Sequence, residues 1–179
     1  MSAPAGGSTV DLDAPLGHIP VLIRSGAALL LHSQPGYTTH ASAAAPYALL
    51  VSLSVDGHAY GTAHIDDGET QPPDAAEQRA DSEDAYAHTH ATGSTAQSRV
   101  IVFSAHDTYL DIWGDGAFGV VQLLGVVTIL GVSRAPRHLT LDGVDVPSRK
   151  WVYDLQVQRL VIFDLSVDLN ERSAFAWGW

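Results

Sequence analysis

The feature that most constrains the fold is a succession of short strand-like runs separated by turns that contain Gly and Asp. Residues 47–54 and 59–66 flank one Asp-Gly pair, and residues 139–141 and 144–146 flank a second. An Asp-Gly pair between β-type runs is a strong hairpin signal. Further runs occur at 99–104, 109–113, 120–124, 126–130, 138–141, 151–153, 159–165 and 173–177. The pattern predicts an all-β chain folded as an antiparallel β-sandwich.

Helical signals are weak by comparison. Only residues 41–45 and 75–87 have a helix-compatible composition, and neither segment shows an apolar stripe at helical spacing. We therefore expect at most short helices between the strands.

Size and charge limit the classes of protein that the chain can belong to. Its 179 residues suffice for one domain or two small ones, whereas a (β/α)8 barrel typically needs about 250. A formal net charge of −11 argues against nucleic acid or an anionic membrane as partner, because both attract basic surfaces. The sequence contains no Cys, so disulfides and thiolate metal ligands are excluded. No signal peptide or membrane-spanning run is expected, and the localisation is left unknown.

One shift in composition divides the chain. Between Asp66 and Asp84 there are eight acidic residues and a single basic one, Arg79, and the sequence stays polar to about Ser98. Such a stretch is typical of a solvated connection. We predict three parts: the truncated end of a first sandwich at 1–70, an acidic polar linker at 71–98, and a second sandwich at 99–179. A chain from about Gln97 to Trp179 is expected to fold alone. The incomplete first part is expected to leave the apolar residues of 19–23 and 27–31 uncovered and so to promote self-association.

Five motifs in order carry a resemblance to a known enzyme family. They lie at 14–24 (APLGHIPVLIR), 34–39 (QPGYTT), 66–70 (DDGET), 127–132 (VTILGV) and 165–177. In this order they resemble the C-terminal region of glycoside hydrolase family 31, the α-glucosidase family. The resemblance implies the end of a proximal β-sandwich followed by a distal one, both downstream of the catalytic barrel.

The resemblance also implies what the chain lacks. Family members hydrolyse α-glucosidic bonds with two carboxyl groups that face each other across the scissile bond. The resemblance places that pair on the barrel, so we predict no catalytic, cofactor-binding or metal residue here and expect the chain alone to be inactive. Its implied role is to buttress the barrel, its partner in cis in the intact enzyme; such enzymes are often secreted or in the secretory pathway. A gene-model fragment without its own function is an alternative interpretation.

Two stretches imitate the catalytic motifs of the family. Asp168-Leu-Asn-Glu171 is similar to the sequence around the nucleophile, and Trp113-Gly-Asp-Gly116 is similar to the sequence around the acid/base residue. Both lie beyond the Asp-Asp-Gly-Glu motif that already follows the barrel in the family. We therefore predict a structural role for the first and a β-turn for the second.

Metal binding has two weak candidates. His88 and His90 would lie on one face of a strand, but no spacing supplies a third ligand, so a solvated loop is favoured. Asp66, Asp67 and Glu69 lack the alternating spacing of a calcium loop and are predicted to form a charged turn.

Four Trp residues keep a second class of function open. Aromatic rings on β-sandwiches can pack against sugars, so an independent carbohydrate-binding module with a weak carbohydrate contact is the main alternative. Trp151 and Trp177 lie in strand patterns and are predicted to be core, whereas Trp179 follows Gly178 and is predicted to be exposed. One exposed Trp does not form a platform for a sugar.

Overall fold

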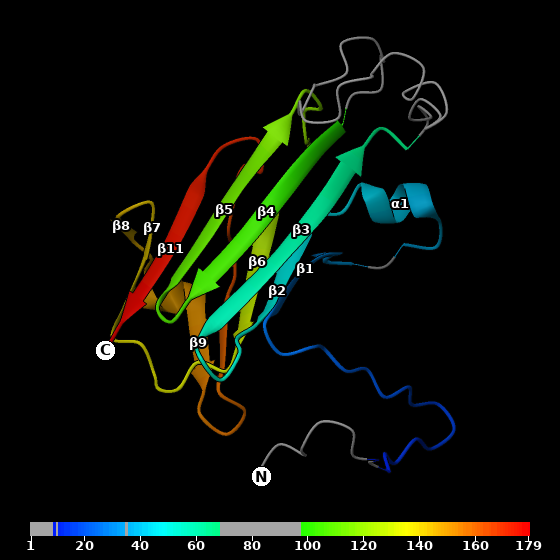
Figure 1. The fold of residues 1–179 in the computed structure, drawn as a ribbon. Helices are drawn as coiled ribbons and strands as arrows, with labels where there is room; N and C mark the ends of the chain where they lie inside the picture. Colours follow the sequence, from blue (N-terminus) through cyan, green and yellow to red (C-terminus); the bar gives the residue numbers. More distant parts are fainter. Residues whose placement is uncertain (1–8, 10, 35, 69–97) are drawn as a thin grey trace, which may run out of the picture.

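The computed structural model describes residues 9, 11–34, 36–68 and 98–179 and shows a single mixed sheet (Figure 1). The strand order is β8-β7-β11-β5-β4-β3-β1-β2-β6-β10-β9. A short helix, α1 (Thr39–Ala43), and a 3-10 turn at Ser148–Lys150 lie between strands. The strands are β1 (Ala27–His32), β2 (Tyr47–Ser52), β3 (His58–Asp66), β4 (Ser98–His106), β5 (Tyr109–Gly116), β6 (Leu124–Leu130), β7 (His138–Leu141), β8 (Val144–Asp145), β9 (Trp151–Asp154), β10 (Arg159–Ile162) and β11 (Ser173–Gly178).

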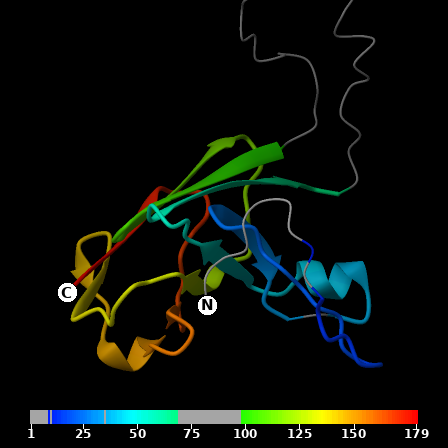
Figure 2. The same ribbon diagram turned by 60° about the horizontal axis from the view of Figure 1, so that its bottom comes forward.

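The sheet curls on itself and so forms two layers. Figures 1 and 2 show β3, β4 and β5 lying over β1, β2 and β6. The bend is at the junction of β1 and β3, which pair only at Ala27 and Tyr60. A side chain at Gly61 would overlap the carbonyl group of Ala28, so glycine permits this close approach. The fold is therefore all-β and sandwich-like, as the sequence predicts.

Two pairings depart from the predicted antiparallel arrangement. Strand β1 runs parallel to β3, and β2 runs parallel to β6 from Tyr47 to Ser52, while the other neighbouring pairs are antiparallel. Parallel neighbours need a long crossover connection. Between β2 and β6 that crossover is made by β3, β4 and β5, which build the opposite layer.

The core fills the space between the layers. Alternate side chains point inward, and Val127 and Ile129 of β6 are fully buried in this way. Leu124, on the other side of a register shift in the pairing with β2, is fully buried as well. The largest buried side chains come from both layers, with Phe103 and Phe175 on one and Leu49 and the β6 residues on the other. All of them belong to one hydrophobic cluster. Residues before and after the acidic stretch thus share one core.

The two Asp-Gly pairs have different outcomes. The second forms the predicted hairpin, because Leu141 pairs with Val144 and both Asp142 (φ 52°) and Gly143 (φ 78°) adopt positive φ angles, as a type I′ turn requires. At the first pair a tight turn is present, with the Gly57 N–H donating to the Ser54 carbonyl at 2.9 Å. The predicted hairpin is wrong there, because the chain crosses to the other layer and β3 pairs with β4 instead.

Other boundaries also differ from the predicted ones. The predicted strand at 120–124 is wrong, because β6 begins only at Leu124. The predicted strand at 159–165 is three residues too long, because β10 ends at Ile162. Strand β1 was not predicted at all. The helix α1 begins two residues before the predicted 41–45, where the Thr38 hydroxyl accepts a hydrogen bond from the Ala41 N–H. The segment 75–87 lies outside the described residues.

The predicted division into 1–70, 71–98 and 99–179 stays a prediction. Strands from both sides of the acidic stretch pair directly, since β3 and β4 are in register from His58–His106 to Asp66–Ser98. The pairing of β2 with β6 joins the two parts a second time.

Candidate functional site: an exposed apolar segment

The chain before β1 carries bulky apolar side chains that are not covered. Leu12, Leu16, Ile19, Val21 and Leu22 are all exposed, Ile19 to 86% and Val21 to 85%. We call these five residues the N-terminal apolar segment. Figure 1 shows this part of the chain as a blue extended stretch running away from the sheet. Exposed apolar residues are common singly, but five within eleven positions are not.

Backbone contacts do not hold this segment to the sheet. Between residues 11 and 25 the described chain forms one local backbone hydrogen bond, from the His18 N–H to the Pro15 carbonyl. The first link to a strand comes at Gly26, whose N–H donates to the Ser52 carbonyl at 2.8 Å. Strand β1 adds to the apolar surface, because Ala28 points into the core while Leu29 and Leu31 are exposed on the other face. Within the described part of the chain, this apolar surface therefore has no covering element.

The predicted stranding of residues 19–23 and 27–31 is confirmed only in part. Ile19, Val21 and Leu22 are exposed, as are Leu29 and Leu31 of β1. Ala28 and Leu30 instead pack with the core, because β1 is an inner strand with one face against the opposite layer.

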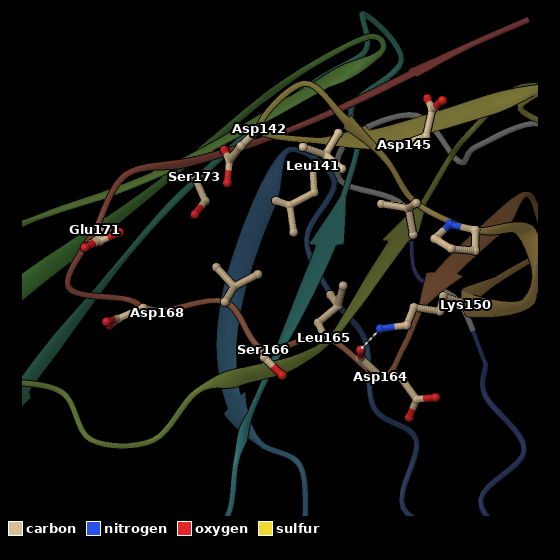
Figure 3. A pocket seen from close by; sticks show the side chains of 14 residues that line it. Leu141, Asp142, Asp145, Lys150, Asp164, Leu165, Ser166, Asp168, Glu171 and Ser173 are labelled. Atoms are coloured by element: carbon tan, nitrogen blue, oxygen red, sulfur yellow. Dashed lines mark hydrogen bonds between the residues drawn. The ribbon is translucent and has the colours of Figure 1, made fainter.

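A second feature is a cavity of about 450 Å³ beside the β7–β8 hairpin (Figure 3). Leu141, Val146, Leu165 and Val167 are among its apolar lining residues. Acidic side chains surround them, and the one cation, Lys150, donates to the Asp164 carbonyl at 2.7 Å. The carboxylates in the lining are Asp142, Asp145, Asp164, Asp168 and Glu171.

Two of these carboxylates already have structural partners. Asp142 accepts a hydrogen bond from the Ala174 N–H at 2.6 Å, and this contact fixes the hairpin to β11. Asp168 accepts from the Asn170 N–H at 2.8 Å. Among the described residues no group of three or more His, Asp or Glu side chains is placed to hold a metal ion. The prediction that the chain has no catalytic, cofactor-binding or metal residue stays a prediction.

The nucleophile-like stretch 168–171 acts as a clamp. The Asn170 side chain accepts from the Val120 N–H and donates to the Val120 carbonyl, each at 2.8 Å. Leu169 is fully buried between these two polar residues. The stretch therefore ties the loop before β6 to the approach to β11, which is the structural role expected. The residue that does most of this, Asn170, gives no sequence signal of its role because its partner is 50 positions away.

The predicted β-turn at Trp113–Gly116 is wrong, because these residues form the end of β5. Trp113 pairs with Val102, and Gly114 pairs with Ile101. A Cβ atom at Gly114 would lie 2.7 Å from the Cδ1 atom of Ile101, so the glycine lets the buried isoleucine pack across the strand. Glycine here reflects close approach within a sheet rather than a turn.

The metal candidates lie in or next to the acidic stretch. His88, His90 and Glu69 lie outside the described residues. Asp66 accepts from the Gly68 N–H at 2.9 Å, as a charged turn would.

Trp177 is buried and Trp151 packs against the core, so both core predictions are confirmed. Trp179 is 38% exposed, as predicted. The guanidinium carbon of Arg134 lies 5.1 Å from its ring centroid, which covers one face of the ring.

Two tyrosines have shifted acidities. Burial raises the pKa of Tyr47, whose ring stacks on His32 at a centroid distance of 5.1 Å. Burial and the negative charge of Asp111 raise the pKa of Tyr109. Arg172 pairs with the same carboxylate at 3.2 Å and acts in the opposite direction. Neither tyrosine lies in the apolar segment, and both shifts favour the neutral phenol.

The comparisons with known proteins first define the class of fold. The fold is similar to part of a chain in the crystal structure of the ER glucosidase II heterodimeric complex, with a TM-score of 0.64 and 18% sequence identity. The match covers 93% of this chain and 18% of the glucosidase II chain. At this identity the likeness shows a shared β-sandwich fold. No protein-family model matches the chain. Within the described residues, no helix is long and apolar enough to cross a membrane.

Sequence similarity then gives the family. The chain is 34% identical over 170 residues to an α-glucosidase of Schizosaccharomyces pombe and 32% identical over 173 residues to an α-glucosidase of Aspergillus niger. These matches cover 95% and 97% of this chain but 15% of each relative. The chain belongs to glycoside hydrolase family 31 and corresponds to a small part of its members.

Proposed function

We propose that the chain is the non-catalytic C-terminal β-sandwich region of a family 31 α-glucosidase-like enzyme and that it buttresses the catalytic barrel. The observation that supports this most is the N-terminal apolar segment. Fully burying a Val, Leu or Ile side chain is worth about 1.5 to 3 kcal/mol, so five such side chains favour a partner surface strongly. In the intact protein that surface would belong to the barrel, and the activity would be hydrolysis of α-glucosidic bonds.

A chimera tests this role. The matching 15% of the Schizosaccharomyces pombe α-glucosidase is replaced by this chain, and hydrolysis of an aryl α-glucoside and soluble yield are measured. We expect an active, soluble chimera. The double substitution Ile19→Asp and Leu22→Asp should reduce both quantities, because two charges would then have to be buried at the interface.

The matched control is Val121→Asp, because Val121 is 81% exposed and lies in the loop between β5 and β6. It should leave yield and activity unchanged. A chimera that carries both Ile19→Asp and Leu22→Asp and is as soluble and active as the unmodified one would contradict the proposal.

A carbohydrate-binding module is the second candidate, and one observation favours it. Tyr60 on β3 and Tyr109 and Trp113 on β5 all point outward from the same layer and are exposed. Titration with maltooligosaccharide should then change Trp fluorescence with saturation, and Trp113→Ala should abolish the change. Trp179→Ala is the control, since Arg134 already covers that ring. A linear, unsaturable response in the unmodified chain would remove this candidate.

A further inference from the structure

The outer face of β3 and β4 brings together two histidines that are far apart in the sequence. His58 and His106 are directly opposite each other in the antiparallel register. One step beyond them, the Asp107 N–H donates to the Gly57 carbonyl at 2.7 Å, so that neighbouring position is hydrogen-bonded. Hydrogen-bonded and non-hydrogen-bonded pairs alternate, which makes His58 and His106 a non-hydrogen-bonded pair, the kind with the closest side chains.

The two imidazole rings meet at this position. Their centroids are 4.5 Å apart and their planes are nearly perpendicular, at 84°. Both residues are exposed. The ring nitrogens form no hydrogen bond with any described residue, although the His58 backbone N–H donates to the Ser54 hydroxyl at 3.1 Å. Four ring nitrogens are thus available around a shallow concavity of about 260 Å³ that Ser54 and Ser104 also line.

We propose that His58 and His106 bind one divalent transition-metal ion of the Zn²⁺, Ni²⁺ and Cu²⁺ class. Imidazole nitrogen is a preferred ligand for these ions. The two rings project from paired strands, so little freedom is lost when both bind one ion. Water completes the coordination, since no described carboxylate joins the pair to make a third ligand. The chain's net charge of −11 also favours cations over anions at its surface.

The position gives such an ion a structural effect. His58 and His106 lie at one end of the β3–β4 pair, and Asp66 and Ser98, which lead into the chain between the two strands, lie at the other. A bound ion therefore joins the strands at the end that the chain connection does not hold. Because the ion would bind the folded chain and not the unfolded one, it should raise the melting temperature in proportion to the logarithm of its concentration.

The test is calorimetric titration of ZnCl₂ or NiCl₂ into the full chain carrying His88→Asn and His90→Asn, which removes two imidazoles outside the described residues. We expect one ion per chain and a higher melting temperature. His58→Asn and His106→Asn should each weaken binding about a hundredfold, because the second ligand adds its affinity intramolecularly. The matched control is His64→Asn, because His64 is on the same face of β3 but is opposite Val100.

A variant that regains binding distinguishes the loss of a metal ligand from misfolding. Val100→His in the His58→Asn background places an imidazole opposite His64 in the same type of non-hydrogen-bonded pair. It should restore binding of one ion. The proposal is overturned if the parent chain binds no ion, or if binding in it is unchanged by His58→Asn and by His106→Asn.

Discussion

Two irregular segments of the molecule behave in opposite ways. Residues 11–25, before β1, form one local backbone hydrogen bond with other described residues and expose their bulky apolar side chains. Residues 163–172, between β10 and β11, also lack a long strand, but backbone hydrogen bonds join them to neighbouring parts of the sheet. Leu165 donates to the Gly125 carbonyl, and Leu124 and Val167 exchange two backbone hydrogen bonds. Lack of regular structure therefore does not explain the exposure of the first segment, which agrees with our proposal that this segment packs on another surface.

The largest effects are expected from two deletions of different length at the N-terminal end. The described bulky apolar side chains within residues 1–25 are exposed, so a chain without residues 1–25 should fold and associate less with itself. Removal of residues 1–97 deletes β1, β2 and β3. These strands contribute Leu49 and Val51 to the shared core, and β2 and β3 are the sheet neighbours of β6 and β4. That shorter chain should lose its cooperative melting transition.

Light scattering and thermal melts distinguish the outcomes. The sequence pattern predicts that residues 97–179 fold alone. The continuous sheet instead predicts that a chain without β1, β2 and β3 does not unfold cooperatively. A sharp transition for 98–179 would mean that the second part is an autonomous domain. Unchanged self-association after removal of 1–25 would show that the apolar surface lies elsewhere.

A single pair of leucines compares the two segments directly. Leu169 is fully buried and Leu16 fully exposed. Leu169→Ala should lower the free energy of unfolding by about 2 to 5 kcal/mol, because it leaves a cavity in the core. Leu16→Ala should change it by less than about 0.5 kcal/mol. Denaturant unfolding measures both, and equal effects would contradict the assignment of one segment to the core and the other to the surface.

The smallest expected effect concerns the Asn170 clamp. Asn170→Ala leaves the N–H and carbonyl of Val120 without their side-chain partner, which should cost about 1 to 3 kcal/mol of stability. The control Gln156→Ala removes an exposed side chain that forms no such clamp and should be neutral. Equilibrium unfolding compares the two variants. A neutral Asn170→Ala would show that water satisfies the Val120 groups equally well.

The parts of the fold that were predictable are those fixed by local chemistry. The 142–143 hairpin follows from residues that tolerate positive φ, and β7 begins and ends where its apolar alternation does. Strand β1 was missed because its sequence, AALLLH, is apolar at successive positions and hides which face is buried. Only its place between β3 and β2 turns Ala28 inward and Leu29 outward.

Contacts between residues far apart in the sequence could not be predicted from the sequence. The parallel pairing of β2 with β6 depends on where three intervening strands fold, and no local signal in Tyr47–Ser52 specifies it. The opposition of His58 and His106 depends on the β3–β4 register in the same way. The exposure of Ile19, Val21 and Leu22 is the exception, because an incomplete first sandwich was expected to leave apolar residues of this stretch uncovered.

The register of β3 and β4 has an evolutionary consequence. These strands remain paired over nine residue positions although 31 residues, 67–97, separate them in the sequence. Closing a longer connection costs little, about 0.6 kcal/mol for each doubling of its length. Insertions and deletions at this point can therefore accumulate between lineages while the sheet is inherited unchanged. The acidic stretch lies in this connection, where a change in length costs little.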